Sequence, residues 1–149
     1  SMTDKSLVLP HNQRGSWMIE IIVSVRVLSI GMLGVASLQA VGLKNNNSAY
    51  LRTQANMMAA DIMDRMRVNR SAAMNSEYDI AIGTASLSGA TVAVSDVNEW
   101  KLSLSSQLPA GDGEVDCDAT GVCTVTVQWT DAQQNGDMGS TSVEVVTRL

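Results

Sequence analysis

One carboxylate stands out by its position, because it lies inside a long run of apolar residues. Glu20 falls within the stretch from Trp17 to Leu38, which is otherwise interrupted by Ser24, Arg26, Ser29 and Ser37. Moving a lone carboxylate into hydrocarbon costs at least about 2.5 kcal/mol, so a buried Glu20 needs a positively charged partner. This pattern therefore predicts the pairing of charges in an apolar environment.

Four acidic side chains alternate along a later segment, with a spacing superficially similar to that of a calcium-binding loop. They are Asp112, Glu114, Asp116 and Asp118. Strand alternation gives a simpler interpretation, in which these four point to solvent while Val115 and Cys117 point inward. A calcium site stays open as an alternative, with residues 131–137 as a second contributor; otherwise we expect no metal and no cofactor.

Composition restricts the remaining chemistry. The only histidine is His11, near the N-terminus, and no phosphate-binding glycine loop or nucleophile elbow is present, so we expect no enzymatic activity. The net charge of -5 argues against nucleic-acid binding by the isolated head, because such binding depends on clustered Lys and Arg. The basic residues that do gather alternate with acids and predict a solvated helix face: Asp61, Asp64, Arg65, Arg67 and Arg70.

The apolar run itself predicts a membrane-spanning helix. About 20 apolar residues are needed to cross a bilayer, and Trp17 to Leu38 supplies that length. A secretory signal peptide has a shorter apolar core, of about 7 to 15 residues, that ends in a cleavage site. Because Lys5 and Arg14 precede the run, the positive-inside rule predicts that residues 1–15 are cytoplasmic and that the chain after about Lys44 is periplasmic.

The sequence around this run resembles the type IV pilins and related pseudopilins. Members of that family are cut directly after a Gly, and the mature chain carries Glu as its fifth residue. Gly15 and Glu20 fall at the matching positions, Met18-Ile19 fits the usual hydrophobic pair, and the likeness continues through residues 28–34. The resemblance implies cleavage between Gly15 and Ser16 by a prepilin peptidase. It also implies that Glu20 acts in subunit assembly by neutralising the N-terminal amine of an adjoining subunit.

Two features depart from the family pattern. Ser16-Trp17 stands where members usually have Phe followed by Ser or Thr, which bears on N-methylation more than on cleavage. Arg26 lies near the middle of the apolar run, where an arginine costs roughly 2.5 to 3.5 kcal/mol. Two interpretations of Arg26 stay open: a residue introduced by engineering, or a natural one that pairs with an acid on a neighbouring subunit. Ser1 before Met2 is typical of a cloning scar.

Three later segments, residues 100–102, 108–111 and 125–129, are most similar to the PilV-type minor pilins. The resemblance implies an α+β pilin fold, in which a long N-terminal helix packs on a small antiparallel β-sheet. The expected organisation is a leader with its cloning scar at 1–15, a membrane and filament-core helix half at 16–43, an amphipathic helix half at 44–74 and a periplasmic head at 75–149.

The function that this resemblance implies is that of a minor subunit of a type IV pilus. It would help to prime or cap pilus assembly and so support twitching motility, attachment or DNA uptake. Its partners would be other minor pilins, the major pilin, the prepilin peptidase and the inner membrane of a Gram-negative bacterium, from which it enters the pilus. Two alternatives remain: a type II secretion pseudopilin, and a tip adhesin whose loops at 76–92 and 131–140 contact a surface receptor.

Helical periodicity predicts two elements that position these residues. One apolar stripe follows helical spacing through Leu51, Ala55, Met58, Ile62 and Met66. After a connecting loop at 75–91, Asp96 and Glu99 have the form of a capping box, which predicts a helix over 96–108 that is packed by Trp100 and ended by Pro109.

The last third of the chain alternates like β-strands. If Cys117 faces Cys123, then Val115 faces Val125, so one register satisfies both a disulfide and an apolar face. Cysteines in an exported domain usually pair, and a redox-active pair would have Cys-x-x-Cys spacing, so we expect a structural Cys117–Cys123 bond. Residues 118–121 supply the Gly of a bulged hairpin turn, and 142–147 predict a further strand.

Overall fold

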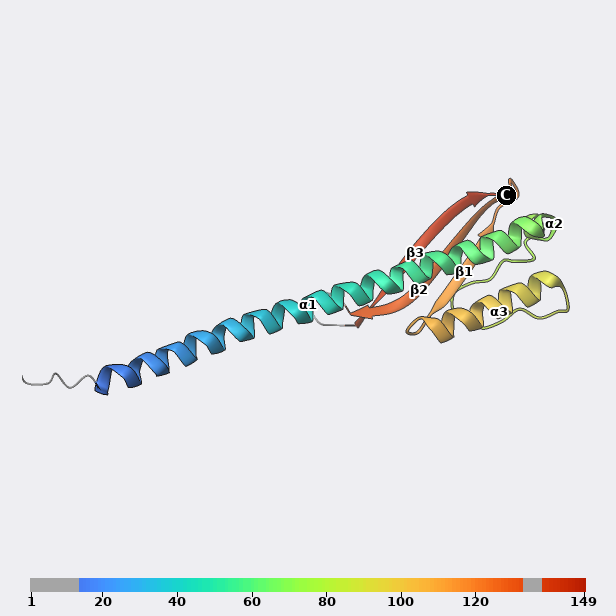
Figure 1. Cartoon of the computed structure of the whole chain (residues 1–149). Coiled ribbons are helices and arrows are strands. Elements are labelled where there is room, and N and C mark those ends of the chain that lie inside the picture. Colours follow the sequence, from blue (N-terminus) through green and yellow to red (C-terminus); the bar gives the residue numbers. More distant parts are fainter. Residues whose placement is uncertain (1–13, 133–137) are drawn as a thin grey trace, which may run out of the picture. The chain divides into compact units, whose positions relative to one another are not determined.

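The structure is a computed structural model that describes residues 14–132 and 138–149, with only the backbone described for 14–16 and 132. The expected leader at 1–15 therefore lies mostly outside the described residues. The fold is α+β, as predicted, with a long N-terminal helix and a small antiparallel sheet in the order β1-β2-β3 (Figure 1). Its elements are α1 (Arg14–Val68), α2 (Arg70–Met74), α3 (Val92–Gln107), β1 (Asp112–Cys117), β2 (Val122–Ala132) and β3 (Met138–Arg148).

Helix α1 contributes to two compact units, Ser1–Leu43 and Lys44–Leu149. In the first unit its large apolar side chains are exposed; Leu38, for example, is 74% exposed. The most apolar stretch of 18 residues has a mean hydropathy of 2.1 and no buried residue. Because a soluble protein does not leave a surface of this kind in water, this part of α1 is a candidate membrane anchor.

In the second unit, α1 buries the apolar stripe that the sequence predicts. Ala55, Ile62 and Met66 are fully buried, and Leu51 and Met58 are nearly so. The polar residues Arg52, Asn56 and Asp64 between them are exposed, as the helical period requires. The stripe is therefore the surface on which this part of the helix packs against the rest of the unit.

The sheet has the predicted register. Val115 lies opposite Val125 and Cys117 opposite Cys123 in the antiparallel β1–β2 pair, which confirms the alternation argument. Strand β3 extends beyond the expected 142–147, and its Val143 and Val145 share one partly buried face. Alternate residues of β2 are completely or almost completely buried: Cys123, Val125, Val127 and Trp129.

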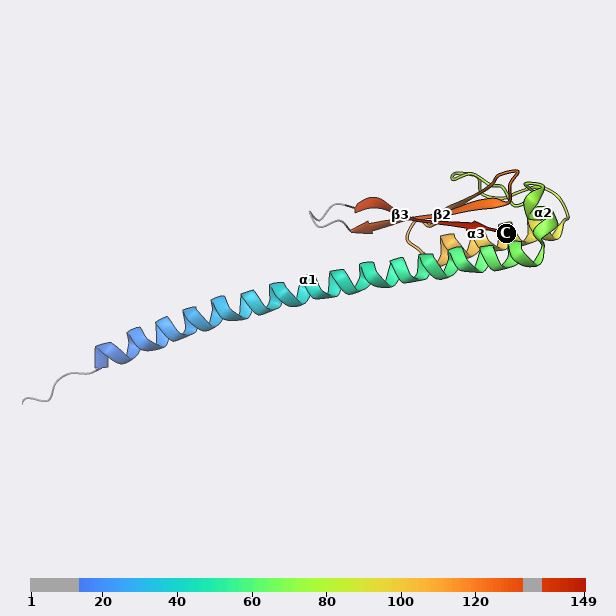
Figure 2. The same cartoon turned by 90° about the horizontal axis from the view of Figure 1, so that it is seen from above.

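Helix α3 and the later turns of α1 pack against this apolar face of the sheet (Figure 2). Trp100 of α3 is 1% exposed, and its indole Nε1 donates a hydrogen bond to the Met58 carbonyl oxygen at 2.9 Å. The ring also lies directly over Gly113 of β1, where an added Cβ would come within 2.4 Å of Trp100 Cη2. The prediction that Trp100 packs this helix is thus confirmed.

The predicted start of α3 is wrong, since the helix begins at Val92 and not at Asp96. Thr91 is the N-cap: its backbone is extended, and its Oγ1 accepts a hydrogen bond from the Val94 amide at 3.3 Å. Asp96 lies in the second turn, where its carboxylate binds side chains from other elements. Because Thr91, five residues earlier, already caps the helix by accepting from the Val94 amide, the proposed capping box is not needed.

The expected helix at 44–74 is also interrupted, because α1 ends at Val68 and α2 starts after Asn69. The side-chain amide of Asn69 donates to the hydroxyl of Tyr78 at 3.3 Å, a contact outside the helix. Residues 75–91 form the predicted loop with one short extended piece. There, Ile80 and Val115 exchange two backbone hydrogen bonds of 2.9 Å, so the loop adds a single bridge to the edge of β1.

Candidate functional site

Glu20 and Arg26 lie in the exposed apolar part of α1, and both side chains are exposed. Six residues of α-helix advance about 9 Å and about 600° around the axis, so the two charges lie about 120° apart on different faces. Within residues 14–132 and 138–149, neither charge has an ion-pair partner. A single chain thus presents two opposite charges outward from an otherwise apolar surface.

The expected processing site lies at the start of the same helix. Because α1 begins at Arg14, the bond between Gly15 and Ser16 falls in its first turn. Cleavage at this bond would leave a chain that begins with a free amine on Ser16 and has Glu20 as its fifth residue.

The two cysteines are joined by a disulfide bond between Cys117 at the end of β1 and Cys123 at the start of β2, with Cα atoms 4.1 Å apart. The connecting turn uses Gly121 at φ +84°, a conformation that favours glycine. The Asp118 carboxylate stabilises the turn by accepting hydrogen bonds from Thr120 and Val122. Hydrogen bonds from the Thr120 hydroxyl, and from the Val122 amide, lower the pKa of Asp118.

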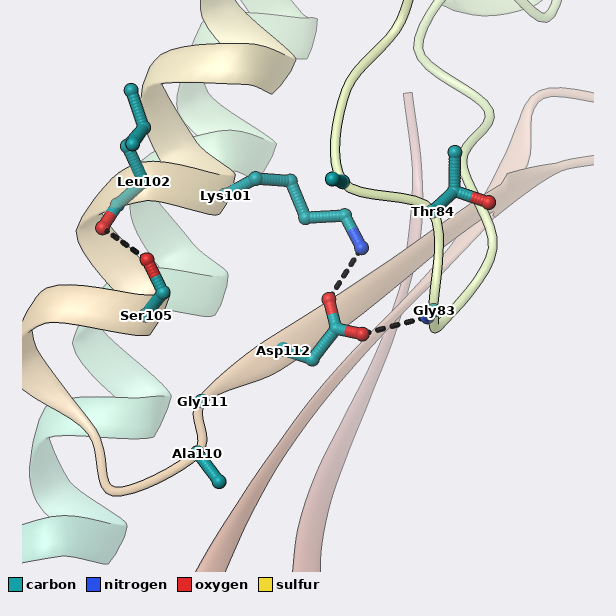
Figure 3. Close-up of a pocket in the computed structure, with 9 residues that line it drawn as sticks. Gly83, Thr84, Lys101, Leu102, Ser105, Ala110, Gly111 and Asp112 are labelled. Carbon is teal, nitrogen blue, oxygen red and sulfur yellow. Dashed lines mark hydrogen bonds and ion pairs between the residues drawn. The ribbon is translucent and has the colours of Figure 1, made fainter.

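Lys101 and Asp112 form a buried ion pair in the second unit (Figure 3). Lys101 is only 5% exposed; its Nζ lies 2.5 Å from Asp112 Oδ1 and donates to the Ala81 carbonyl oxygen at 3.2 Å. Asp112 Oδ2 accepts from the Gly83 amide at 2.7 Å. The expectation that Asp112 points freely to solvent is therefore wrong, because its carboxylate neutralises a lysine that α3 turns toward the sheet.

This pair determines the charge state of the carboxylate. Burial alone would raise the pKa of Asp112, but the hydrogen bond from Lys101 and the backbone amides of Gly83 and Gly113 outweigh burial and lower it. A surface hollow of about 450 Å³ adjoins the pair and is also lined by Thr84, Leu102 and Ser105. Since Lys101 and Asp112 already satisfy each other at this hollow, their geometry indicates a structural role.

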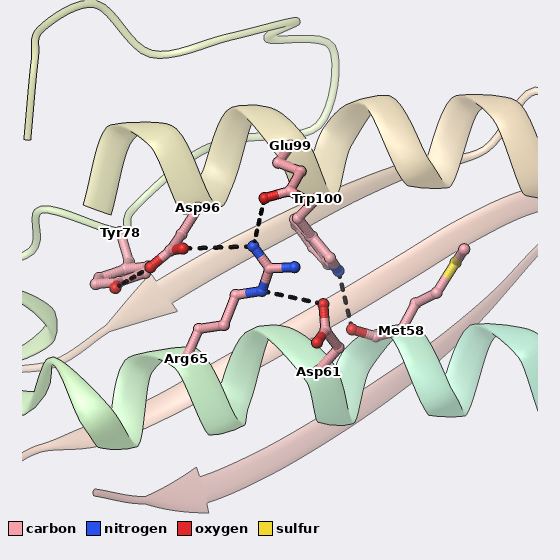
Figure 4. Close-up of polar contacts among 7 residues, drawn as sticks. All are labelled: Met58, Asp61, Arg65, Tyr78, Asp96, Glu99 and Trp100. Atoms are coloured by element: carbon pink, nitrogen blue, oxygen red, sulfur yellow. Dashed lines mark hydrogen bonds and ion pairs between the residues drawn. The ribbon is translucent and has the colours of Figure 1, made fainter. Parts of the chain in front are cut away.

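A second polar cluster joins α1 to α3 through Arg65 (Figure 4). Its Nη1 lies 2.9 Å from Glu99 Oε2 and 3.3 Å from Asp96 Oδ1, and its Nε lies 3.2 Å from Asp61 Oδ2. The hydrogen bond to Glu99 is the largest of the effects that raise the pKa of Arg65. For Arg65 the predicted solvated helix face is thus wrong, whereas Arg67 is exposed and pairs with Asp64 at 2.6 Å on the same helix.

Tyr78 is fully buried at one end of this cluster, and its hydroxyl donates to Asp96 Oδ2 at 2.7 Å. Burial, followed by this hydrogen bond, raises the pKa of Tyr78 to about 12. Burial also raises the pKa of the nearby Asp79, although its Oδ1 accepts a hydrogen bond from the Cys117 amide at 3.1 Å. These groups fix the loop at 75–91 to α3 and to β1.

The acidic residues do not assemble into a metal centre in the part of the chain that the structure describes, where no three His, Cys, Asp or Glu side chains form such a group. Asp112 is bound to Lys101, and Asp118 accepts the hydrogen bonds of its own turn. Residues 133–137 of the second proposed calcium loop lie outside the described residues. Two of the described carboxylates of the calcium alternative, Asp112 and Asp118, are thus engaged by protein groups.

Sequence reasoning missed Lys101 and the bridging role of Arg65. The signal for Lys101 was present, because Val97, Trp100 and Leu104 define an apolar stripe and position 101 falls on it by helical spacing. A lysine on a buried stripe requires a nearby acid. For Arg65 no comparable signal exists, since its partners on α3 are more than thirty residues away.

Comparisons with known proteins add no relative to this description. No protein-family model, curated protein or solved structure matches the chain.

Proposed function

We propose that this chain is a minor subunit of a type IV pilus, which helps to prime or cap assembly together with other minor pilins and the major pilin. The apolar part of α1 would lie in the inner membrane and later in the filament core, with the second unit on the periplasmic side. The observation that carries the proposal is Glu20, a carboxylate that projects from an exposed apolar helix five residues beyond Gly15.

The physical mechanism is the burial of apolar helices against one another. A helix that leaves the bilayer keeps its side chains away from water only if other helices replace the lipid. Glu20 cannot be buried in such a bundle without a cation, because an uncompensated charge in an apolar environment costs several kcal/mol. The amine released by cleavage after Gly15 supplies one such cation, so that processing and assembly become linked through one ion pair.

The second unit fits the exported side of this proposal. The Cys117–Cys123 disulfide is compatible with an oxidising periplasm. A core that includes Trp100 and Trp129 is enclosed by α1, α3 and the sheet, so this unit has its own core. The membrane anchor and the head thus have separate physical environments.

The test replaces Glu20 by Ala in a piliated bacterium that lacks its native copy of the subunit. The variant should still enter the membrane, because removing a charge from an apolar span favours insertion. Incorporation into sheared pili, or pilus number, should fall by roughly tenfold, since one buried charge pair is worth more than 1 kcal/mol in assembly.

Ser29→Ala is the matched control, because the Ser29 hydroxyl donates a hydrogen bond to the Val25 carbonyl oxygen of its own helix at 2.7 Å. This control should assemble normally. Normal piliation by the Glu20→Ala protein would refute the proposed mechanism. A loss of protein secretion without any loss of pili would assign the chain to a type II secretion system instead.

A further inference from the structure

We infer that Arg26 of one copy pairs with Glu20 of the next copy, in parallel helices displaced by six residues along their axes. The inference rests on the proposed function in one respect, namely that all copies enter the membrane in the same direction. It assigns a role to the cation that is least expected in the apolar part of α1. The occupant of this helix surface is thus a second copy of the same chain.

Pairing within one helix is excluded by geometry. Side chains that interact along a helix are three or four residues apart, whereas Glu20 and Arg26 are separated by six. Their directions differ by about 120°, so the two side chains diverge from the axis. Each charge must therefore find its partner on another molecule or remain unpaired in an apolar environment.

The displacement follows from charge complementarity. Two parallel copies at the same level would place Glu20 beside Glu20 and Arg26 beside Arg26, which is repulsive in both places. A shift of six residues, about 9 Å, brings Glu20 of one copy level with Arg26 of the other. An antiparallel pair could satisfy both charges at once, around Val23, but two copies inserted in the same direction cannot form it.

This contact does not close on itself. In the displaced pair one Glu20 and one Arg26 are used, while the remaining Arg26 and Glu20 lie about 18 Å apart along the axis on the two outer ends. Each free charge can accept a further copy in the same way. Because the two sites on one helix point in different directions, the interface is heterologous and adds copies in one direction.

The experiment measures the displacement by cross-linking the full-length chain in a bacterium that has no pilus genes. Without a prepilin peptidase no amine forms beside Glu20, so Arg26 is the cation available within the apolar span. Two differently tagged copies are co-expressed, one with Ser24→Cys and one with Ile30→Cys. Position 24 lies one turn from Glu20 and position 30 lies one turn from Arg26, each on the same face.

A short bis-maleimide should join Ser24→Cys to Ile30→Cys in the membrane. The parent chain, whose Cys117 and Cys123 are bonded to each other, is the reagent control and should give no product. Ser24→Cys alone tests the undisplaced arrangement, and Val23→Cys alone tests the antiparallel one. Either of these giving more product than the mixed pair would overturn the inference.

Charge variants then test the pair itself. Glu20→Gln or Arg26→Gln should reduce the mixed product by roughly tenfold, because each leaves one charge unpaired. The exchanged chain Glu20→Arg with Arg26→Glu should restore it. A mixed product that is unaffected by either single change, or not restored by the exchange, would show that the pair does not set the contact.

The outcomes separate the inference from the proposed function. If Glu20→Ala abolishes piliation but the cross-link is absent, the inference fails and the proposed function stands. If the cross-link follows the charges but piliation is normal in the Glu20→Ala strain, the proposed function fails and the contact between copies stands.

Discussion

The ammonium of Lys101 lies 2.5 Å from Oδ1 of Asp112, so the first residue of β1 neutralises a buried charge on α3. A lysine at 5% exposure is held in place because the same Nζ also binds the Ala81 carbonyl oxygen. The pair therefore joins three segments. Removing one partner should be destabilising mainly because the charge of the other partner stays buried without compensation.

Asp112→Asn should lower the free energy of unfolding by about 2 kcal/mol, because it leaves the Lys101 charge buried without its carboxylate. Urea denaturation of the full chain in detergent micelles, followed by tryptophan fluorescence, measures this change. Glu114→Gln removes the same charge from the same strand and should change stability by less than about 0.5 kcal/mol. Equal effects from the two variants would contradict a specific role for the pair.

The same contact predicts an acid dependence of stability. The pKa of Asp112 is lowered in the folded state, so its contribution is complete above the ordinary value of 3.8 and is lost as the pH falls through the folded-state value. The difference in stability between the parent and Asp112→Asn should therefore shrink below about pH 4. Asp79, whose pKa is raised, has the opposite dependence, but it is present in both proteins and cancels in the difference.

Tyr78 should ionise late in an alkaline titration. In a Tyr50→Phe protein it is the only tyrosine, and the phenolate absorbance should rise near pH 12, since the pKa of Tyr78 is raised to about 12. Stability from the neutral hydroxyl is fully present below pH 10 and is lost as the pH rises from about 10 to 12.

Asp96→Asn should lower that midpoint, because the hydrogen bond to Asp96 is the second cause of the shift after burial. Asp64→Asn removes an equal charge from an exposed position of α1 and serves as the control, which should leave the midpoint unchanged. A midpoint near the ordinary tyrosine value in the parent protein would contradict the buried environment of Tyr78.

The disulfide should be detectable and modest in effect. Non-reducing mass spectrometry of periplasmic material should show a peptide linked through Cys117 and Cys123, without alkylatable thiols. Replacing both by Ala should lower the free energy of unfolding by about 2 kcal/mol at most, because the closed loop is short. The control is a reducing agent, which should destabilise the parent and leave the double variant unaffected.

Processing should depend on Gly15. Co-expression with a prepilin peptidase should give a mature chain that starts at Ser16, and N-terminal sequencing identifies that residue. Gly15→Leu should leave the full-length precursor in the membrane, because a bulky side chain at the cut blocks the site that the family resemblance implies. Cleavage at another bond in the parent chain would contradict the assignment of the leader.

Local sequence patterns correctly predicted two features: the buried face of a single helix and the register of a single pair of strands. The stripe from Leu51 to Met66 needed only helical periodicity, and the Val115–Val125 register needed only alternation with one buried face. The prediction of where α3 starts failed because two polar residues, Thr91 and Asp96, were both suitable as N-caps. Only the contact of Asp96 with Tyr78 and Arg65 shows that its carboxylate was required elsewhere.

The candidate sites divide in the same way. Glu20 is a candidate from the sequence alone, because a carboxylate in an apolar run is unusual in any context. Strand alternation predicted wrongly that Asp112 points to solvent. Alternation gives the direction of a side chain but does not show which residues of other elements lie next to it. Lys101 comes from another element and reaches across the strand's edge, so no local period contains this contact.

Gly113 has a consequence for how α3 and the sheet recognise each other. The Trp100 ring occupies the space that a side chain at this position would need, although the backbone there is ordinary for any residue. Sliding β1 by one residue would bring Asp112 or Glu114 under the indole, and sliding it by two would bring Val115, whose Cβ cannot fit. The missing side chain thus selects against these neighbouring registers of β1 beneath the helix.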